Sequence, residues 1–362
     1  MGDTAQNRFS WLAVLKIAGA FTAYLIGSGF ATGQEAMQFF AAYGAVGVLG
    51  ASLSLLLFVY VCLSLMSAGK HYGLTRNEDV FRFYCGDFIG VFLTWYTMIF
   101  IVAVHAVMLA GAGATLEQAY GIPSFVGASL MAVLSMATLL LGLEKILGAL
   151  GVLGPLIVAL TMSVAALSLF NAQGTLADHS KLALELDLLK ASPHWLFSSL
   201  LYVGMTLPGL ASFLPAVGAT THNDREIKIS SVIGPVVFIG AMVLIVLALL
   251  YQISDVHDAQ IPVMVLASQV MPVYGAIFAI IIFMGIFTTV TPLLWTVCAR
   301  FASEGTARYR WLVVCLTLVG LVGGTLLPFG ELINMIYPTV GYAGLLFLAC
   351  AVFRDLRRFR DR

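Results

Sequence analysis

Residues 27–35 read Gly-Ser-Gly-Phe-Ala-Thr-Gly-Gln-Glu and interrupt the first hydrophobic stretch of the chain. That stretch covers roughly residues 11–41 and is long enough to cross a bilayer. The glycines and small polar residues at its middle predict a broken helix, whose freed backbone N–H and C=O groups lipid cannot satisfy. Such a break persists only where protein or a water-filled cavity covers it, and there the backbone itself commonly binds a ligand.

The composition is that of an integral membrane protein. Hydrophobic residues make up 60% of the 362 residues, and charged residues make up 10%. A soluble domain cannot cover so much apolar surface. The long uncharged runs predict an all-α protein with ten membrane-spanning helices. Their expected ranges are 11–41 (broken), 45–69, 87–116, 122–142, 145–170, 193–218 (broken), 228–252, 271–301, 309–328 and 331–353.

Basic residues are distributed unevenly between the two sets of loops. With the N-terminus inside, only Lys181 and Lys190 of the 18 Lys and Arg residues fall in outside loops. Positive charge concentrates on the cytoplasmic side of membrane proteins. We therefore expect a multi-pass protein of the cell (inner or plasma) membrane with both termini in the cytoplasm. Two outside segments, 182–189 and 258–270, look partly helical. The second could be a lid over the outer mouth, or a surface loop with one helical turn.

The sixth predicted span has its own interruption, residues 204–209, which read Gly-Met-Thr-Leu-Pro-Gly. Pro208 has no N–H to donate to the carbonyl of Gly204, which predicts that this carbonyl is free. Five spans precede residues 171–192 and five follow, so the second half starts from the opposite side of the membrane. Broken helices in corresponding places of two inverted halves are typical of secondary transporters. We expect one transmembrane domain over 1–362, with inverted repeats at about 11–170 and 193–353.

This arrangement resembles the leucine-transporter (LeuT) fold of the amino acid–polyamine–organocation (APC) superfamily. Residues 26–35 are similar to the Gly-Ser-Gly motif of that superfamily's first helix, and the string 27–35 most resembles the YkvI family of bacterial membrane proteins. The resemblance covers essentially the whole chain. It implies alternating access, in which the first and sixth helices move with their bundle against a scaffold of the third, fourth, eighth and ninth helices.

The two breaks predict a two-sided binding site. Backbone N–H groups around Ser28, Gly29 and Phe30 would form a helix N-terminus suited to a carboxylate. The free carbonyl of Gly204 would suit an ammonium group or another cation. An amino acid, or a related small amine or carboxylate, would satisfy one or both sides. The candidate substrate-binding residues are Ser28, Gly29, Phe30, Ala31, Thr32, Gly33, His105, Tyr202, Gly204, Met205, Thr206 and Asn334.

Three polar residues of the predicted spans have open roles. Glu35 could bind a substrate amine, carry a proton, or cap and gate the break, and Gln34 is grouped with it as a gate or proton-linked residue. His105 lies in the middle of an uncharged span, where an ionisable residue commonly has a function. It could contact substrate or carry a proton, and the alternative is a neutral histidine bonded to a neighbouring helix.

A cation-coupling site is predicted on the eighth span. Thr288 and Thr289 provide hydroxyl oxygens of the kind that hard cations prefer, and the pair resembles the sodium-binding Thr/Ser pair of sodium-coupled LeuT-fold transporters. The resemblance implies that Ala23, Ile26 and Gly285 complete a Na⁺ site with their carbonyls. Alternatively, both hydroxyls bond to their own helix, as Thr commonly does in membranes.

A sodium-coupled symporter is therefore the expected function. A proton-coupled or ion-independent exchanger of the same fold and a non-transporting membrane sensor are the alternatives. An enzyme is not expected, because the sequence contains no HExxH motif, paired Asp motif or nucleophile–base pair. A channel would usually show a repeated pore element or a charged ring. The expected partners are a small-molecule substrate and the lipid bilayer, without nucleic acid. Apart from Na⁺ as the coupling ion, no cofactor is expected.

Overall fold

The computed structural model describes residues 9–26, 28–141, 153–170 and 172–360, and in these ranges all regular secondary structure is helical. Eight helices are long and apolar enough to cross a membrane. They are α4 (Ala45–Tyr72), α5 (Asn77–Tyr120), α6 (Ser124–Leu141), α10 (Trp195–Thr220), α11 (Asp224–Tyr251), α14 (Pro272–Phe301), α15 (Ala307–Gly324) and α16 (Phe329–Arg360). The shorter α8 (Leu153–Phe170) and the interrupted first span complete the ten predicted spans. Residues 145–152 of the fifth predicted span lie outside the described residues.

Short elements make up the rest of the structure. The first span consists of α1 (Trp11–Leu25), α2 (Ser28–Thr32) and α3 (Gln34–Phe39), and it is followed by the 3₁₀ turn η1 (Ala41–Tyr43). Three connecting helices are α9 (Leu176–Glu185), α12 (Ile253–Val256) and α13 (Pro262–Val270). The expected helix at 182–189 is therefore displaced toward the N-terminus. The segment 258–270 forms α13, with Pro262 in its first turn as expected.

Local sequence explains several of the helix boundaries. The side chain of Ser10 caps α1 by accepting a hydrogen bond from the backbone N–H of Ala13. Thr306 caps α15 in the same way. Gly86 interrupts α5 with a φ of 76°, a conformation that glycine adopts without steric cost. The apolar part of α5 therefore begins at residue 87, where the sequence predicts it.

Charged contacts between helix termini mark one end of the molecule, which we call the terminal end. There Lys70, near the end of α4, forms an ion pair of 2.7 Å with Asp224 at the start of α11. Arg300, near the end of α14, pairs at 3.2 Å with Glu78 at the start of α5. The opposite end, which carries α9, α12 and α13, is called the α13 end. At the terminal end, α4 and α14 therefore finish, while α5 and α11 begin.

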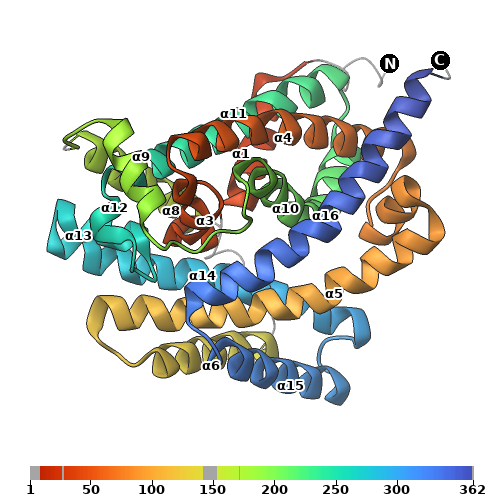
Figure 1. Cartoon of the computed structure of the whole chain (residues 1–362). Helices are drawn as coiled ribbons and strands as arrows, with labels where there is room; N and C mark the ends of the chain where they lie inside the picture. Colours follow the sequence, from red (N-terminus) through yellow and green to blue (C-terminus); the bar gives the residue numbers. More distant parts are fainter. Residues whose placement is uncertain (1–8, 27, 142–152, 171, 361–362) are drawn as a thin grey trace.

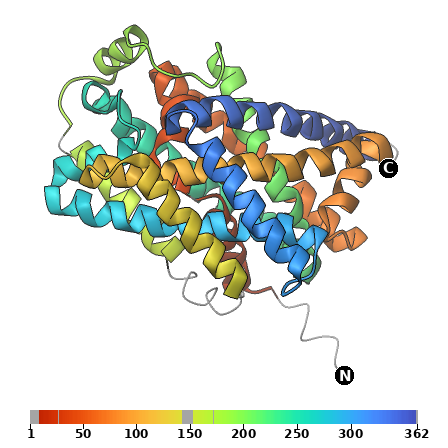
Figure 2. The ribbon, with the colours of Figure 1, turned by 90° about the horizontal axis from the view of Figure 1, so that it is seen from below.

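The helices form two groups in contact with each other. One group, the bundle, contains the first span, α4, α10 and α11, and the other, the scaffold, contains α5, α6, α14 and α15. Figure 1 shows α4 and α11 side by side at one edge, α6 and α15 at the opposite edge, and the first span and α10 between them. In Figure 2, α6 and α15 slant across α5 and α14. The membership of the two groups agrees with the division implied by the resemblance.

The predicted break in the sixth span is corrected by the structure, because α10 runs as one helix from Trp195 to Thr220 with Pro208 and Pro215 inside it. Close packing surrounds α10 on both sides. A Cβ on Gly218 would overlap the carbonyl of Met66 in α4, and a Cβ on Gly344 in α16 would overlap the carbonyl of Gly204. Neighbouring helices therefore hold α10 continuous although its prolines remove backbone hydrogen bonds.

Candidate functional site

The first span is interrupted twice, which confirms the predicted break. α1 ends at Leu25, and Ile26 leaves helical geometry with φ −81° and ψ 81°. A second interruption separates α2 from α3 at Gly33, whose φ of 85° is left-handed. A residue with a Cβ would be strained in that conformation. The glycine therefore allows α3 to start in a new direction and brings Glu35 into the interior.

Glu35 lies directly over the first break. A Cβ on Gly29 would overlap the carboxylate of Glu35, so the carboxylate rests against the Cα atom of Gly29. The side chain of Glu35 is in the interior, and the residue is only 8% exposed. Among the described residues it has no hydrogen-bond or ion-pair partner. The position predicted to hold a substrate carboxylate is thus covered by a carboxylate of the chain itself.

A cavity of about 280 Å³ extends from Glu35 between the bundle and the scaffold. It reaches Asn77, the first residue of α5, and Thr296, near the end of α14. Both residues lie toward the terminal end, so the cavity runs in that direction. Its other described lining residues are Tyr24, Leu25, Thr97, Phe100, Ile101, Val104, Tyr202, Met205, Thr206, Pro208, Gly209, Ser212, Leu293 and Tyr337.

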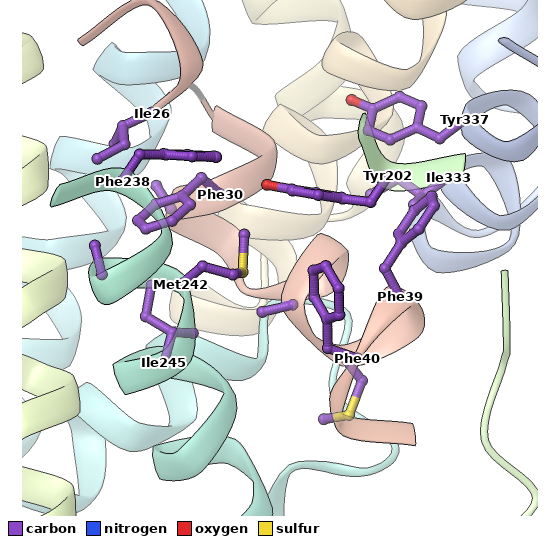
Figure 3. Close-up of a cluster of buried hydrophobic side chains, with 14 of the residues drawn as sticks. Ile26, Phe30, Phe39, Phe40, Tyr202, Phe238, Met242, Ile245, Ile333 and Tyr337 are labelled. Atoms are coloured by element: carbon purple, nitrogen blue, oxygen red, sulfur yellow. The ribbon is translucent and has the colours of Figure 1, made fainter. Parts of the chain in front are cut away.

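Two tyrosines accompany Glu35 at the deep part of the cavity. Tyr202 of α10 is 1% exposed, and Tyr337 of α16 is 5% exposed. Figure 3 shows the ring of Tyr202 among side chains of the first span and α11, with Tyr337 at the edge of this cluster near Ile333. Phe39 and Phe40 contact the ring of Tyr202 edge-on, with centroid distances of 5.5 and 4.9 Å. Neither phenol oxygen makes a hydrogen bond to any described residue, so both remain available to a ligand.

Side-chain amides close the molecule on the other side of Glu35. The amide of Gln34 donates to the carbonyl of Ala259 before α13 at 2.8 Å, and that of Gln38 donates to the carbonyl of Gly330 in α16 at 2.8 Å. Asn334 donates to the side-chain oxygen of Gln38 at 3.1 Å. Two further amides take part: Gln118 bonds to the backbone of Ile261, and Gln260 accepts from the N–H of Gly330. We call these side chains the amide network: Gln34, Gln38, Gln118, Gln260 and Asn334.

The helix α13 covers the broken span at this end. A Cβ on Gly33 would overlap the side chain of Val263, so the turn between α2 and α3 lies directly beneath α13. Gln118 at the end of α5 exchanges two hydrogen bonds of 2.9 Å with the backbone of Ile261. Of the two alternatives for residues 258–270, the structure therefore has the lid: the first part of α13 is buried and closes the α13 end.

The cavity gathers some of the predicted site residues and omits others. Tyr202, Met205, Thr206 and Glu35 line it. Phe30, Ala31, Thr32, Gly29 and Gly33 are buried in packing around the break, and they are not among its described lining residues. The side chain of Ser28 lies outside the described residues. Gln34 and Asn334 belong to the amide network, and the carbonyl of Gly204 packs against Gly344.

His105 lies within the scaffold and is fully buried. Its ring rests against Gly320 of α15, where a Cβ would overlap it, and near the backbone of Val290 in α14. Val104, its neighbour in sequence, lines the cavity, whereas His105 does not. In this conformation His105 therefore packs between helices and is one layer away from the candidate site.

The residues of the predicted sodium site make local contacts. The hydroxyls of Thr288 and Thr289 donate to the carbonyl of Gly285 at 2.7 and 3.2 Å. Ile26 is buried and Ala23 is exposed. The hydroxyl contacts follow the back-bonding alternative, and they also bring three oxygen atoms of α14 together.

Sequence reasoning missed several residues of the cavity. Tyr24 lies in the last turn of α1, two positions before Ile26, and Tyr337 directly precedes Pro338 inside α16. Thr97, Phe100 and Val104 recur at helical spacing on one face of α5. That spacing could have marked the cavity face of α5. Tyr337 had no comparable signal, because only the packing of α16 brings it to Glu35.

No family model matches the chain. Over 357 residues it is 25% identical to the uncharacterized membrane protein YkvI of Bacillus subtilis (strain 168), an alignment that covers 96% of this chain and 97% of the relative. It is also 24% identical over 341 residues to the uncharacterized protein YyaD of the same organism, covering 94% of this chain and 96% of that protein.

Solved structures of a manganese transporter of Eremococcus coleocola share the fold. A mutant form has a TM-score of 0.55 at 15% sequence identity and covers 94% of this chain and 77% of that chain. A complex of the same transporter with an aromatic bis-isothiourea substituted compound has a TM-score of 0.54 at 16% identity, covering 97% and 78%. The chain is therefore a multi-pass helical membrane protein, similar over nearly its whole length to YkvI and folded like these transporter structures.

Proposed function

We propose that the protein is a secondary active transporter that moves a small amine- or carboxylate-bearing substrate, such as an amino acid, across the cell membrane by alternating access. One observation carries this proposal: the cavity at Glu35 extends only toward the terminal end, while the amide network and α13 close the α13 end. A site near the middle of the membrane with access from one side is what alternating access requires.

The transport cycle follows from the contacts that would have to change. Opening the α13 end requires separation of Gln34 from Ala259 and of Gln38 from Gly330, both of which are joined by single hydrogen bonds of 2.8 Å. Each such bond contributes about 1 kcal/mol of net stability. Substrate or ion binding that favours the open arrangement would offset this cost and shift the population between the two states.

The comparisons favour transport over catalysis, because the neighbouring structures are those of a transporter. Their manganese is not proposed as the substrate here. No group of three or more His, Cys, Asp or Glu side chains suited to a metal occurs among the described residues. Membership of the APC superfamily, the inverted repeats at 11–170 and 193–353 and cytoplasmic termini are parts of the same proposal.

For the coupling ion we propose sodium, bound by Gly285, Thr288 and Thr289 together with the carbonyls of Ala23 and Ile26. The support is the oxygen cluster on α14, in which both hydroxyls lie within 3.2 Å of the Gly285 carbonyl. Proton coupling is the second candidate. It is favoured by Glu35, since a buried carboxylate without a partner is stabilised when it takes up a proton or binds a cation.

Counterflow in proteoliposomes tests the proposed function. Proteoliposomes that contain the purified protein and an unlabelled amine or amino acid should accumulate the labelled compound from outside. Vesicles that lack the protein should not. A membrane sensor of this fold would bind the compound without exchanging it, and that result would overturn the proposal. Thr288→Ala should reduce the sodium dependence of uptake, while Thr325→Ala on the exposed end of α15 should leave it unchanged.

A further inference from the structure

Among the described residues, one charged group lines the cavity. Of its described lining residues only Glu35 carries a charge, and the lining includes no Lys, Arg or His. The carboxylate is more than nine-tenths buried and has no partner among the described residues. A buried charge is costly unless it is paired. A positively charged ligand would therefore be stabilised in this cavity.

Aromatic rings surround the remaining space. Tyr24, Phe100, Tyr202 and Tyr337 all line the cavity with Glu35. Faces of aromatic rings attract cations, most strongly where water is excluded. The phenol oxygens of Tyr202 and Tyr337 are free of hydrogen bonds to described residues and can accept from an ammonium N–H. The rest of the lining is mainly apolar, so it suits a hydrocarbon body.

The same geometry disfavours a carboxylate on the ligand. The carboxylate of Glu35 already rests against Gly29, at the helix break expected to receive an anion. A second carboxylate there would be repelled by Glu35, and no basic side chain of the described lining would compensate it. A divalent metal ion is disfavoured too, because one carboxylate balances only half of its charge.

We propose that the cavity binds a monovalent organic amine cation with an apolar body and no carboxylate, its ammonium group held by Glu35, Tyr202 and Tyr337. This narrows the substrate class and rests on the proposed function in treating the cavity as the transport site. The cavity volume of about 280 Å³ lies near the lower limit of ligand pockets, which suits a small molecule.

The experiment measures binding of three compounds of one skeleton to the purified full chain by isothermal titration calorimetry. Phenethylamine is the cation, phenylalanine the zwitterion and 3-phenylpropanoate the anion. We expect phenethylamine to bind at least tenfold more tightly than phenylalanine and 3-phenylpropanoate to give no heat. Glu35→Gln should weaken phenethylamine binding at least tenfold. Glu226→Gln, a change at a buried carboxylate near Ser10 and outside the cavity, should not.

Tighter binding of phenylalanine, binding of none of the three, or equal affinity of Glu35→Gln for phenethylamine would each overturn the proposal. Counterflow separates this result from failure of the proposed function. If the protein exchanges phenylalanine but not phenethylamine, the proposed transport function stands and the proposed amine specificity is refuted. If phenethylamine binds in a Glu35-dependent way but is not exchanged, the proposed amine site is supported and the proposed transport function is refuted.

Discussion

The side-chain amide of Gln34 and the backbone carbonyl of Ala259 are joined by a hydrogen bond of 2.8 Å, although 225 positions separate them in the chain. This bond connects α3, the last helix of the broken span, to the segment that leads into α13. On the other side of the same short helix, Glu35 faces the cavity. Two successive residues of α3 therefore have different surroundings: Gln34 bonds at the closed α13 end, and Glu35 lines the cavity.

Replacing Gln34 with Leu should loosen the closed end. The change removes bonds to Ala259 and to Gln38, each of which contributes about 1 kcal/mol. We expect faster amide hydrogen exchange in residues 258–270. Gln269→Leu is the matched control, because Gln269 lies on α13 itself but bonds to Asp255 at the surface. Equal exchange in the two variants would show that the amide network does not hold α13.

Gly29→Ala should displace the carboxylate of Glu35. The added Cβ would overlap that carboxylate, which is the flexible end of a side chain and can move into the cavity. We expect counterflow activity to fall roughly tenfold, as a loss of about 1.4 kcal/mol of binding free energy would cause, with little change in unfolding temperature. Gly19→Ala, a change on α1 with open space around it, should keep full activity. Unaltered activity of Gly29→Ala would contradict this placement of Glu35.

Tyr337→Phe should weaken ligand binding and leave the fold intact. The phenol oxygen of Tyr337 has no hydrogen bond to a described residue, so its removal leaves no group unpaired. One lost hydrogen bond of about 1 kcal/mol corresponds to about a fivefold rise in Kd. Tyr342→Phe, on the same helix but 55% exposed, provides the comparison in calorimetry. A Kd that does not change would exclude a hydrogen bond between the phenol of Tyr337 and the ligand.

Gly218→Ala should destabilise the contact between α4 and α10. Its Cβ would overlap the carbonyl of Met66, and a backbone atom cannot move aside as a side chain can. Overpacking of this kind costs about 1–3 kcal/mol. Gly240→Ala on α11 meets nothing within 4 Å and should be neutral or stabilising by up to about 1 kcal/mol. Chemical unfolding in detergent measures both, and equal stabilities would refute the close approach.

Hydropathy and local sequence were sufficient to predict the membrane-spanning helices. Membrane helices must satisfy their backbone groups internally, so long uncharged runs predict them reliably. The break in the first span was also predictable, because three glycines fall within residues 27–33 and glycine has a low helix propensity. The predicted break at Pro208 was wrong for a reason outside the local sequence: Gly204 and Gly218 let α16 and α4 approach α10 and hold it as one helix.

The partners of individual side chains could be identified only from the tertiary structure. A helix that is apolar on all sides does not reveal which face turns inward, and in lipid close packing determines its rotation. Gly204 consequently faces α16 while Met205 and Thr206 face the cavity. Glu35 was identified from the sequence with three possible roles. Its position beside Tyr337 depends on packing between segments about 300 residues apart, and the hydropathy pattern does not reveal that packing.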